Sequence, residues 1–499
     1  MREGKTGNRL KWLIVSITVI VTLTASGLLL AASQPVRADS PGKALLDASQ
    51  GLDDITIHAV YHPDSRTLDA VQTICITNTF TQSVTELVLR TYANAFMRED
   101  TSPAAIEEIY DQCYPNGFSS GGMSVSRIMV NGREVPAVYR DTAGTVLAIP
   151  LDTPLGAGET VTVDLAYQLT LPECRYRFGY ADGVAVFGNA FPVPAVFEDG
   201  AFREEAYYPI GDPFISDCAN YHVSVTVPEG YRAVGSGCSV RDGQTFTFDS
   251  IAVREFALVI SDAYVEQTGK AGGVAVFSYA RTSAQARKAL NVTLRALEVF
   301  TERIGALPYP SLTIAQTSFA FTGMEYPQLF LLGSDGYDGH DSTLEWTAAH
   351  ETAHQWFYAA VGSDQYYAPW QDEALCEYLV YDYIGARYGQ SARQDAINRR
   401  AGAAMRVTVP RGVTAGSPIS YFSDFAEYSL VVYHRGAALL VALEEAYGRE
   451  TLMDALRVYY DRYSFKRATR QDFEDTLAEA TGRNMKELIV DYLDTYIIH

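Results

Sequence analysis

The first half of the chain alternates between apolar and polar positions. Apolar residues occupy every second position in 55–61, 161–165 and 221–227, and turn-forming Gly, Asn and Pro residues separate such runs. A period of two is typical of strands that bury one face. We therefore predict an N-terminal antiparallel β domain, saddle-like or sandwich-like, over residues 39–265.

The hydrophobic spacing becomes helical in the second half. Leu290, Leu294 and Leu297 lie on one face of a predicted helix over 283–304, and Gly305 follows where a helix end favours glycine. Further runs predict helices at 343–361, 372–388, 391–404, 429–447, 450–463, 469–481 and 484–497. The sequence thus predicts a second, mainly helical domain over residues 266–499, and a multidomain α+β protein as a whole.

The N-terminal residues 1–38 have the order of an export signal. A basic segment precedes the uncharged residues 12–32, and small residues follow up to Ala38. The apolar stretch is also long enough to span a bilayer. Two outcomes stay open, cleavage after Ala38 or retention of 12–32 as a membrane anchor. Either outcome places the chain from Asp39 onward outside the cytoplasm, secreted or at the cell surface.

Composition and charge narrow the range of partners. Hydrophobic residues make up 47% of the 499 residues, which is enough for large buried cores. The chain has 39 Lys and Arg against 60 Asp and Glu, a formal net charge of −21. Because nucleic-acid binding needs a basic surface, nucleic acid is not an expected partner. Six cysteines form no CxxC motif; Cys218 and Cys238 are the closest pair for a disulfide, and buried thiols are the alternative.

One predicted helix contains His350-Glu351-Thr352-Ala353-His354, an HExxH motif. Residues four apart share a helix face, so both imidazoles can reach one Zn²⁺ ion, and Glu351 lies beside them as a general base. A metzincin would need Gly and His three and six residues after His354, where this chain has Phe357 and Ala360. That class is therefore excluded.

A glutamate from the following helix is the alternative third ligand. Glu373 fits, because the intervening residues allow the first helix to end, a loop to turn and a new helix to begin. Glu377 lies one turn further along the same face and can accept the outer N–H of a ligand histidine. We interpret Cys376, between them, as a small packing residue.

These motifs resemble the zinc aminopeptidases of the M1, or gluzincin, family. The resemblance rests on 350–357 and on Glu373 in Trp370-Gln371-Asp372-Glu373-Ala374. It extends to Gly323-Met324-Glu325-Tyr326, which is similar to the family's G-x-M-E-N segment, and to Tyr433 in 432–437. The resemblance implies a thermolysin-like catalytic domain, in a short bacterial-type form that lacks the C-terminal helical domain of larger members.

The family also implies roles for individual residues. One Zn²⁺ would be held by His350, His354 and Glu373, with water in the fourth position. Glu351 would act as general base while that zinc-bound water attacks the peptide, and Tyr433 would stabilise the oxyanion.

Substrate recognition follows from the same resemblance. Glu325, with Gly323 and Met324, would pair with the free α-ammonium group of a peptide and so define an aminopeptidase. Asn189 is the candidate for a second contact with that amine. The expected partners are therefore peptides with free N-termini, and the sequence does not specify an oligomeric state.

Several departures and alternatives stay open. Tyr326 stands where the family has Asn, which affects the hydrogen bonding around Glu325, and Asp372 also replaces Asn. A thermolysin-type endopeptidase would use the same zinc chemistry without needing Glu325. A catalytically weak peptide-binding or sensing ectodomain would keep the site without useful turnover. Epoxide hydrolysis, known for one branch of the family, has no distinguishing residue in this chain.

Overall fold

A computed structural model describes residues 42–338, 341–409 and 412–495. The predicted export signal or anchor, residues 1–38 with the apolar stretch 12–32, lies outside these ranges. Within them, none of the helices combines the length and the apolar character needed to cross a membrane.

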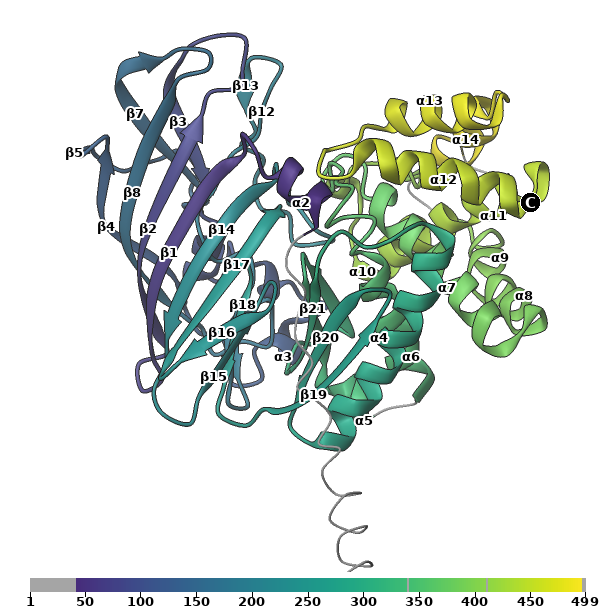
Figure 1. Cartoon of the computed structure of the whole chain (residues 1–499), viewed down its shortest axis with the longest axis horizontal. Helices are drawn as coiled ribbons and strands as arrows, with labels where there is room; N and C mark the ends of the chain where they lie inside the picture. Colours follow the sequence, from purple (N-terminus) through teal and green to yellow (C-terminus); the bar gives the residue numbers. More distant parts are fainter. Residues whose placement is uncertain (1–41, 339–340, 410–411, 496–499) are drawn as a thin grey trace, which may run out of the picture. The chain divides into compact units, whose positions relative to one another are not determined.

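Residues 53–261 form three sheets and a small hairpin (Figure 1). The largest sheet has eight strands in the order β16-β17-β14-β1-β2-β8-β4-β5, and the two four-stranded sheets are β15-β18-β10-β9 and β11-β3-β7-β6. The strands are β1 (Asp53–His62), β2 (Thr67–Thr77), β3 (Val84–Arg90), β4 (Gly122–Val130), β5 (Arg133–Glu134), β6 (Val138–Tyr139), β7 (Val146–Leu155), β8 (Thr160–Thr170), β9 (Phe178–Ala181), β10 (Val184–Phe187), β11 (Val193–Pro194), β12 (Phe197–Glu198), β13 (Ala201–Phe202), β14 (Ala219–Thr226), β15 (Arg232–Gly235), β16 (Ser239–Asp242), β17 (Thr245–Val253) and β18 (Leu258–Ser261). Short helical turns lie among them or before them: α2 (Lys43–Ala48), η1 (Tyr92–Met97), η2 (Pro103–Ala105) and α3 (Tyr110–Cys113).

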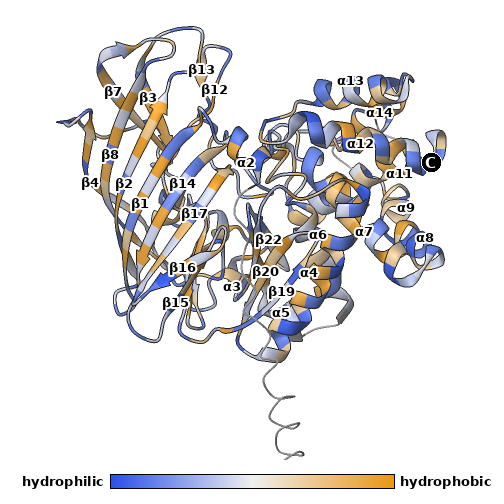
Figure 2. Cartoon of the chain, in the orientation of Figure 1, coloured by the Kyte–Doolittle hydropathy of each residue, from blue (hydrophilic) through white to orange (hydrophobic). Residues whose placement is uncertain are grey.

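The period-two pattern sets which face of the large sheet is buried. Along β1, Ile55, Ile57, Ala59 and Tyr61 are buried and the residues at the positions between them are more exposed, and β8 alternates in the same way. Figure 2 shows this alternation as polar and apolar bands along the strands. The pairing is antiparallel except between β1 and β14, which run parallel with Ile57 opposite Val223. The predicted β domain is thus confirmed, with one parallel pair that local patterning does not reveal.

The second half combines a five-stranded sheet with a helical layer. The sheet order is β19-β20-β21-β23-β22, and β22 is an edge strand. The strands are β19 (Val265–Ala271), β20 (Val274–Ala280), β21 (Ser311–Thr317), β22 (Gly323–Tyr326) and β23 (Leu329–Gly333). The helices are α4 (Ser283–Arg303), α5 (Ser334–Asp338), α6 (Asp341–Ala353), α7 (Trp370–Tyr388), α8 (Gln390–Arg399), α9 (Ala401–Ala404), η3 (Ile419–Tyr421), α10 (Phe425–Tyr428), η4 (Ser429–Arg435), α11 (Gly436–Tyr447), α12 (Arg449–Tyr463), α13 (Arg470–Thr481) and α14 (Lys486–Leu493). A mainly helical domain after a β domain is confirmed, whereas the division at residues 265 and 266 stays a prediction.

The runs at 343–361, 391–404 and 429–447 differ from the predicted helices, and the second of them divides at Arg400 into α8 and α9. The run at 343–361 is helical only to Ala353, and beyond it Tyr358 takes a φ of 136° and its carbonyl accepts a 2.8 Å hydrogen bond from Arg254 Nε of the β domain. The run at 429–447 begins with the π-helix η4 before α11 continues it. π-Turns are rare inside helices and occur often at functional sites.

The six cysteines all lie in the described part of the chain, and no disulfide joins any two of them. Cys376 is completely buried in α7, in accord with its interpretation as a packing residue. The Cys218–Cys238 pairing considered from the sequence is absent from this structure.

Candidate metal centre and cleft

Helices α6 and α7 bring three metal-binding side chains together. His350 Nε2 lies 3.0 Å from His354 Nε2, and Glu373 Oε2 lies 3.1 Å and 3.3 Å from these two nitrogens. His354 follows α6 directly, and its N–H still bonds to the carbonyl of His350 at 3.2 Å, so the four-residue spacing keeps both rings on one side. All three side chains are buried.

This donor set fits Zn²⁺. A tetrahedral ion with bonds of about 2.0–2.1 Å separates its ligand atoms by roughly 3.3 Å, close to the spacings found here. The outer nitrogens also suit that role, since His354 Nδ1 lies 3.1 Å from the carbonyl oxygen of Phe357 and His350 Nδ1 lies 3.8 Å from Glu377 Oε2. A hydrogen bond from His354 Nδ1 to that carbonyl leaves its inner Nε2 free of a proton for the ion, and Glu377 lies on the outer side of His350.

Glu377 connects the ligands to residues that the sequence did not single out. Trp346 Nε1 donates to its Oε2 at 3.0 Å, and Arg400 Nη1 donates to its Oε1 at 2.9 Å. His434 Nδ1 lies 3.3 Å from the same Oε1. His434 directly follows Tyr433, which was a signal available from the sequence, whereas Arg400 is brought here only by the packing of α8 and α9 against α7.

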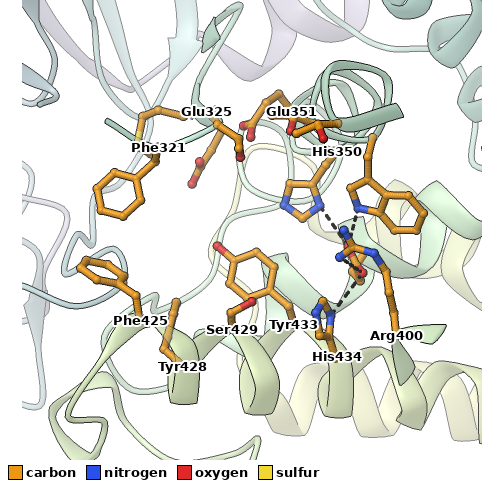
Figure 3. Close-up of a pocket in the computed structure, with 18 of the residues that line it drawn as sticks. Phe321, Glu325, His350, Glu351, Arg400, Phe425, Tyr428, Ser429, Tyr433 and His434 are labelled. Atoms are coloured by element: carbon orange, nitrogen blue, oxygen red, sulfur yellow. Dashed lines mark hydrogen bonds and ion pairs between the residues drawn. The ribbon is translucent and has the colours of Figure 1, made fainter. Parts of the chain in front are cut away.

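One of the three metal-binding side chains, His350, lines a cleft of about 790 Å³ (Figure 3). Its lining includes His350, Glu351, Tyr433 and the segment Gly323–Glu325. Glu351 is buried, and its Oε2 has no hydrogen-bond partner among the described residues. An unpartnered carboxylate oxygen beside a ligand set is placed to accept a proton from a bound molecule.

Burial dominates the electrostatics around the cleft. It raises the pKa of Glu351 and of Asp372 to about 8, and it raises the pKa of Glu325 well above its usual value. Burial also acts on Glu373, but hydrogen bonds from His350 and His354 lower the pKa of that carboxyl to about 2. Glu373 is therefore the carboxylate best prepared to hold a cation.

Glu325 reaches the centre from the edge strand β22. Its oxygen, together with single carboxylate oxygens of Asp212 and Glu373, lies in a group whose members are within 4.8 Å of one another. Gln365 Nε2 lies 3.4 Å from Glu325 Oε1 and donates to Asp372 at 2.8 Å. Asp212 and Gln365 were not predicted from the sequence, because both stand on irregular segments without a spacing signal.

Asn189 and Tyr326 meet outside the cleft lining. The Tyr326 hydroxyl donates to Asn189 Oδ1 at 3.3 Å, and Asn189 Nδ2 donates to buried Glu255. Asn189 borders a separate, very small cavity of the β domain. Tyr326, which stands where the family has Asn, thus anchors the end of β22 to the β domain. The structure does not bring Asn189 into the lining of the cleft.

Tyr433 approaches the metal ligands from the π-helix η4. Its hydroxyl donates a hydrogen bond to Glu373 Oε1, and its ring stacks on His350 with centroids 5.6 Å apart and planes inclined by 22°. Burial raises its pKa well above the usual value, so the hydroxyl keeps its proton at neutral pH. The π-turn shifts the helix register, and Tyr433 lines the cleft along with Tyr428 and Ser429.

Fold and site together define a class of protein. A helix-borne histidine pair, a glutamate from the next helix and a free carboxylate beside a cleft are the parts of a mononuclear HExxH metallohydrolase site.

The second half of the chain matches a known protein family. Residues 288–493 match the Peptidase family M1 domain. The helical half of this chain is therefore similar to a peptidase family M1 domain, and that family implies one Zn²⁺, for which His350, His354 and Glu373 are a fitting donor set.

Relatives extend the similarity toward the N-terminus. The chain is 25% identical over 404 residues to aminopeptidase N of Lactobacillus delbrueckii subsp. lactis and 27% identical over 405 residues to aminopeptidase N of Lactobacillus helveticus. Each alignment covers 74% of this chain and 46% of the relative, so the chain spans about half the length of these relatives. The crystal structure of an M1 zinc metallopeptidase from Deinococcus radiodurans matches with a TM-score of 0.64 at 16% identity, covering 89% of this chain and 95% of that one. This likeness confirms the two-domain fold.

Proposed function

We propose that this chain is a zinc-dependent aminopeptidase that removes N-terminal residues from peptides. The observation that carries the proposal is the position of Glu325, whose carboxylate shares one small region with the metal ligand Glu373. A carboxylate that close to the scissile carbonyl allows only one residue between the α-ammonium group and the bond to be cut. The export pattern of residues 1–38 supports action outside the cytoplasm.

Substrate binding follows from charge. Arg177 pairs with Asp212, whereas no arginine or lysine pairs with the buried Glu325 among the described residues, so its carboxylate favours a cation such as a peptide α-ammonium. An acetylated N-terminus supplies no charge and adds bulk, so it would leave the Glu325 carboxylate uncompensated. The amine contact thus positions the first peptide bond beside the ligand set.

The chemical step uses residues on both sides of that bond. Zinc, when bound, polarises the carbonyl and makes water a stronger acid. Glu351 takes the proton of the attacking water through its free Oε2 and delivers a proton to the leaving amine. Tyr433 turns its hydroxyl from Glu373 to the developing oxyanion, which a neighbouring hydrogen-bond donor stabilises by about 3–4 kcal/mol.

A pair of peptides tests this function. The full chain, purified with zinc, is incubated with Leu-Ala-Ala amide and with its N-acetylated form, and Glu351→Gln serves as the blank. We expect cleavage of the free peptide alone, and loss of cleavage after chelation or in the variant. Cleavage of both peptides would indicate an endopeptidase, and cleavage of neither by the zinc-loaded chain would indicate a binding module.

A further inference from the structure

The two ends of the cleft carry opposite charge. Glu325 lines one end, beside the paired Arg177 and Asp212, whereas Arg399 and Arg400 line the other, at the junction of α8 and α9. In Figure 3, His350 and Tyr433 lie between Glu325 and Arg400. The chain as a whole has a net charge of −21, and these two neighbouring arginines place positive charge at this end of the cleft.

Arg400 is held in place but not saturated. Its Nη1 donates to Glu377 at 2.9 Å, and its guanidinium carbon lies 3.9 Å from the centre of the Trp346 ring. A guanidinium carries five N–H donors, of which this contact uses one. About a third of the side chain stays exposed. Stacking on Trp346 therefore fixes the guanidinium plane while donors remain available to a ligand.

Arg399 is the more available of the two. It lines the cleft and is exposed, and among the described residues it makes no ion pair or hydrogen bond. The remaining arginine of the lining, Arg177, differs because it is buried and paired with Asp212 at 2.5 Å. Arg399 thus presents a free cation to the solvent-filled cleft.

The direction of a bound peptide determines which of its residues lies beside Arg399 and Arg400. This step rests on the proposed function, in which Glu325 holds the α-ammonium group and the leaving part of the peptide points away from it. Only the Glu377 carboxylate separates Arg400 from the ligand ring of His350, through contacts of 2.9 Å and 3.8 Å. Two extended residues span about 7 Å, so the second residue after the cleaved bond reaches this region.

We propose that Arg399 and Arg400 bind a carboxylate on the leaving side of the substrate, within two residues of the cleaved bond. The cleft then matches the dipole of a short peptide, with its ammonium at the acidic end and its carboxylate at the basic end. The carboxylate has two sources, the C-terminus of a short peptide or an acidic side chain at the same place in a longer one.

A substrate series tests the proposal with the full zinc-loaded chain. Leu-Ala-Ala is compared with Leu-Ala-Ala amide, and Leu-Ala-Glu amide with Leu-Ala-Gln amide. We expect kcat/KM to be about tenfold higher for the charged member of at least one pair, and the ratio to fall with added salt. A preference in the first pair alone identifies the C-terminus as the source, and a preference in the second pair identifies the side chain.

Variants assign the preference to the arginines. Arg399→Gln should reduce the ratio to about threefold, and Arg399→Lys should restore part of it. Arg406→Gln is the matched control. Arg406 is exposed and lies outside the cleft lining, and its substitution by Gln removes the same charge. Ratios near one in the parent chain, or equal losses in both variants, would overturn the inference. No cleavage of the free-amine amides would instead contradict the proposed function.

Discussion

Gly323 is the position at which a single methyl group should misplace the general base. Its backbone lies so close to α6 that a Cβ would stand 2.8 Å from Glu351 Cδ and 2.6 Å from Thr347 Cγ2, and closer still to Glu351 Oε1. Carbon atoms in contact prefer separations of about 3.5–4.0 Å, so Gly323→Ala must displace the carboxylate by about 1 Å.

The size of the effect follows from that displacement. An error of about 1 Å in a reacting group costs about 10²-fold in rate, or roughly 2.7 kcal/mol in the barrier. We expect Gly323→Ala to lower kcat on Leu-Ala-Ala amide by about 10²-fold and to leave zinc content and thermal stability almost unchanged. The assay is steady-state kinetics, with zinc measured by atomic absorption and unfolding followed by circular dichroism.

Two further variants make the test specific. Gly336→Ala in α5 is the matched control, because its added Cβ would meet only Leu344 Cδ1, at an ordinary 3.7 Å. Gly323→Ala with Thr347→Ser removes the threonine methyl but retains the collision with Glu351, so activity should stay low. A kcat of Gly323→Ala within threefold of the parent, with zinc bound, would refute the reasoning; recovery in the double variant would mean that Thr347 moves instead.

Three other variants probe catalysis and stability. Tyr433→Phe should lower kcat by about 10²–10³-fold with KM within about threefold, because it removes the oxyanion donor along with its hydrogen bond to Glu373; steady-state kinetics would contradict this if kcat were unchanged. Burial raises the pKa of Asp53 from 3.8 to about 6, so the folded chain holds this proton more tightly and stability falls as pH rises from about 4 to about 6. Asp53→Asn should remove that fall, at most about 3 kcal/mol, and urea unfolding at pH 4.5 and pH 7.5 checks it. Arg177→Met should cost about 3–5 kcal/mol in urea unfolding because it leaves Asp212 buried without its cation, and adding Asp212→Asn should recover part of this loss.

The sequence by itself determined the elements and their order. Strict alternation in 55–61 specifies a strand whatever its partner, and helical spacing in 283–304 specifies an amphipathic helix. The HExxH motif also needs little more than local geometry, since residues four apart on a helix share a face. These features depend on neighbours within a few residues, and such neighbours can be read from a linear chain.

Tertiary structure decided which residues from distant parts of the sequence come into contact. Arg254 of the β domain binds the Tyr358 carbonyl where the helix of His350 has ended, and no local signal reports an atom 104 residues away. The parallel pairing of β1 with β14, and the arrival of Asp212 beside Glu325, are contacts of the same kind.

The opposite charges of the cleft show the same division most directly. Glu325 stands in a motif that the sequence displays, but Arg399 and Arg400 end an ordinary helix and acquire meaning only when α8 packs near Glu377. Local spacing is set by the covalent chain, whereas the potential at a point depends on every charge that folding brings there. The sequence therefore determined the candidate ligands, and only the fold decided the polarity of the cleft around them.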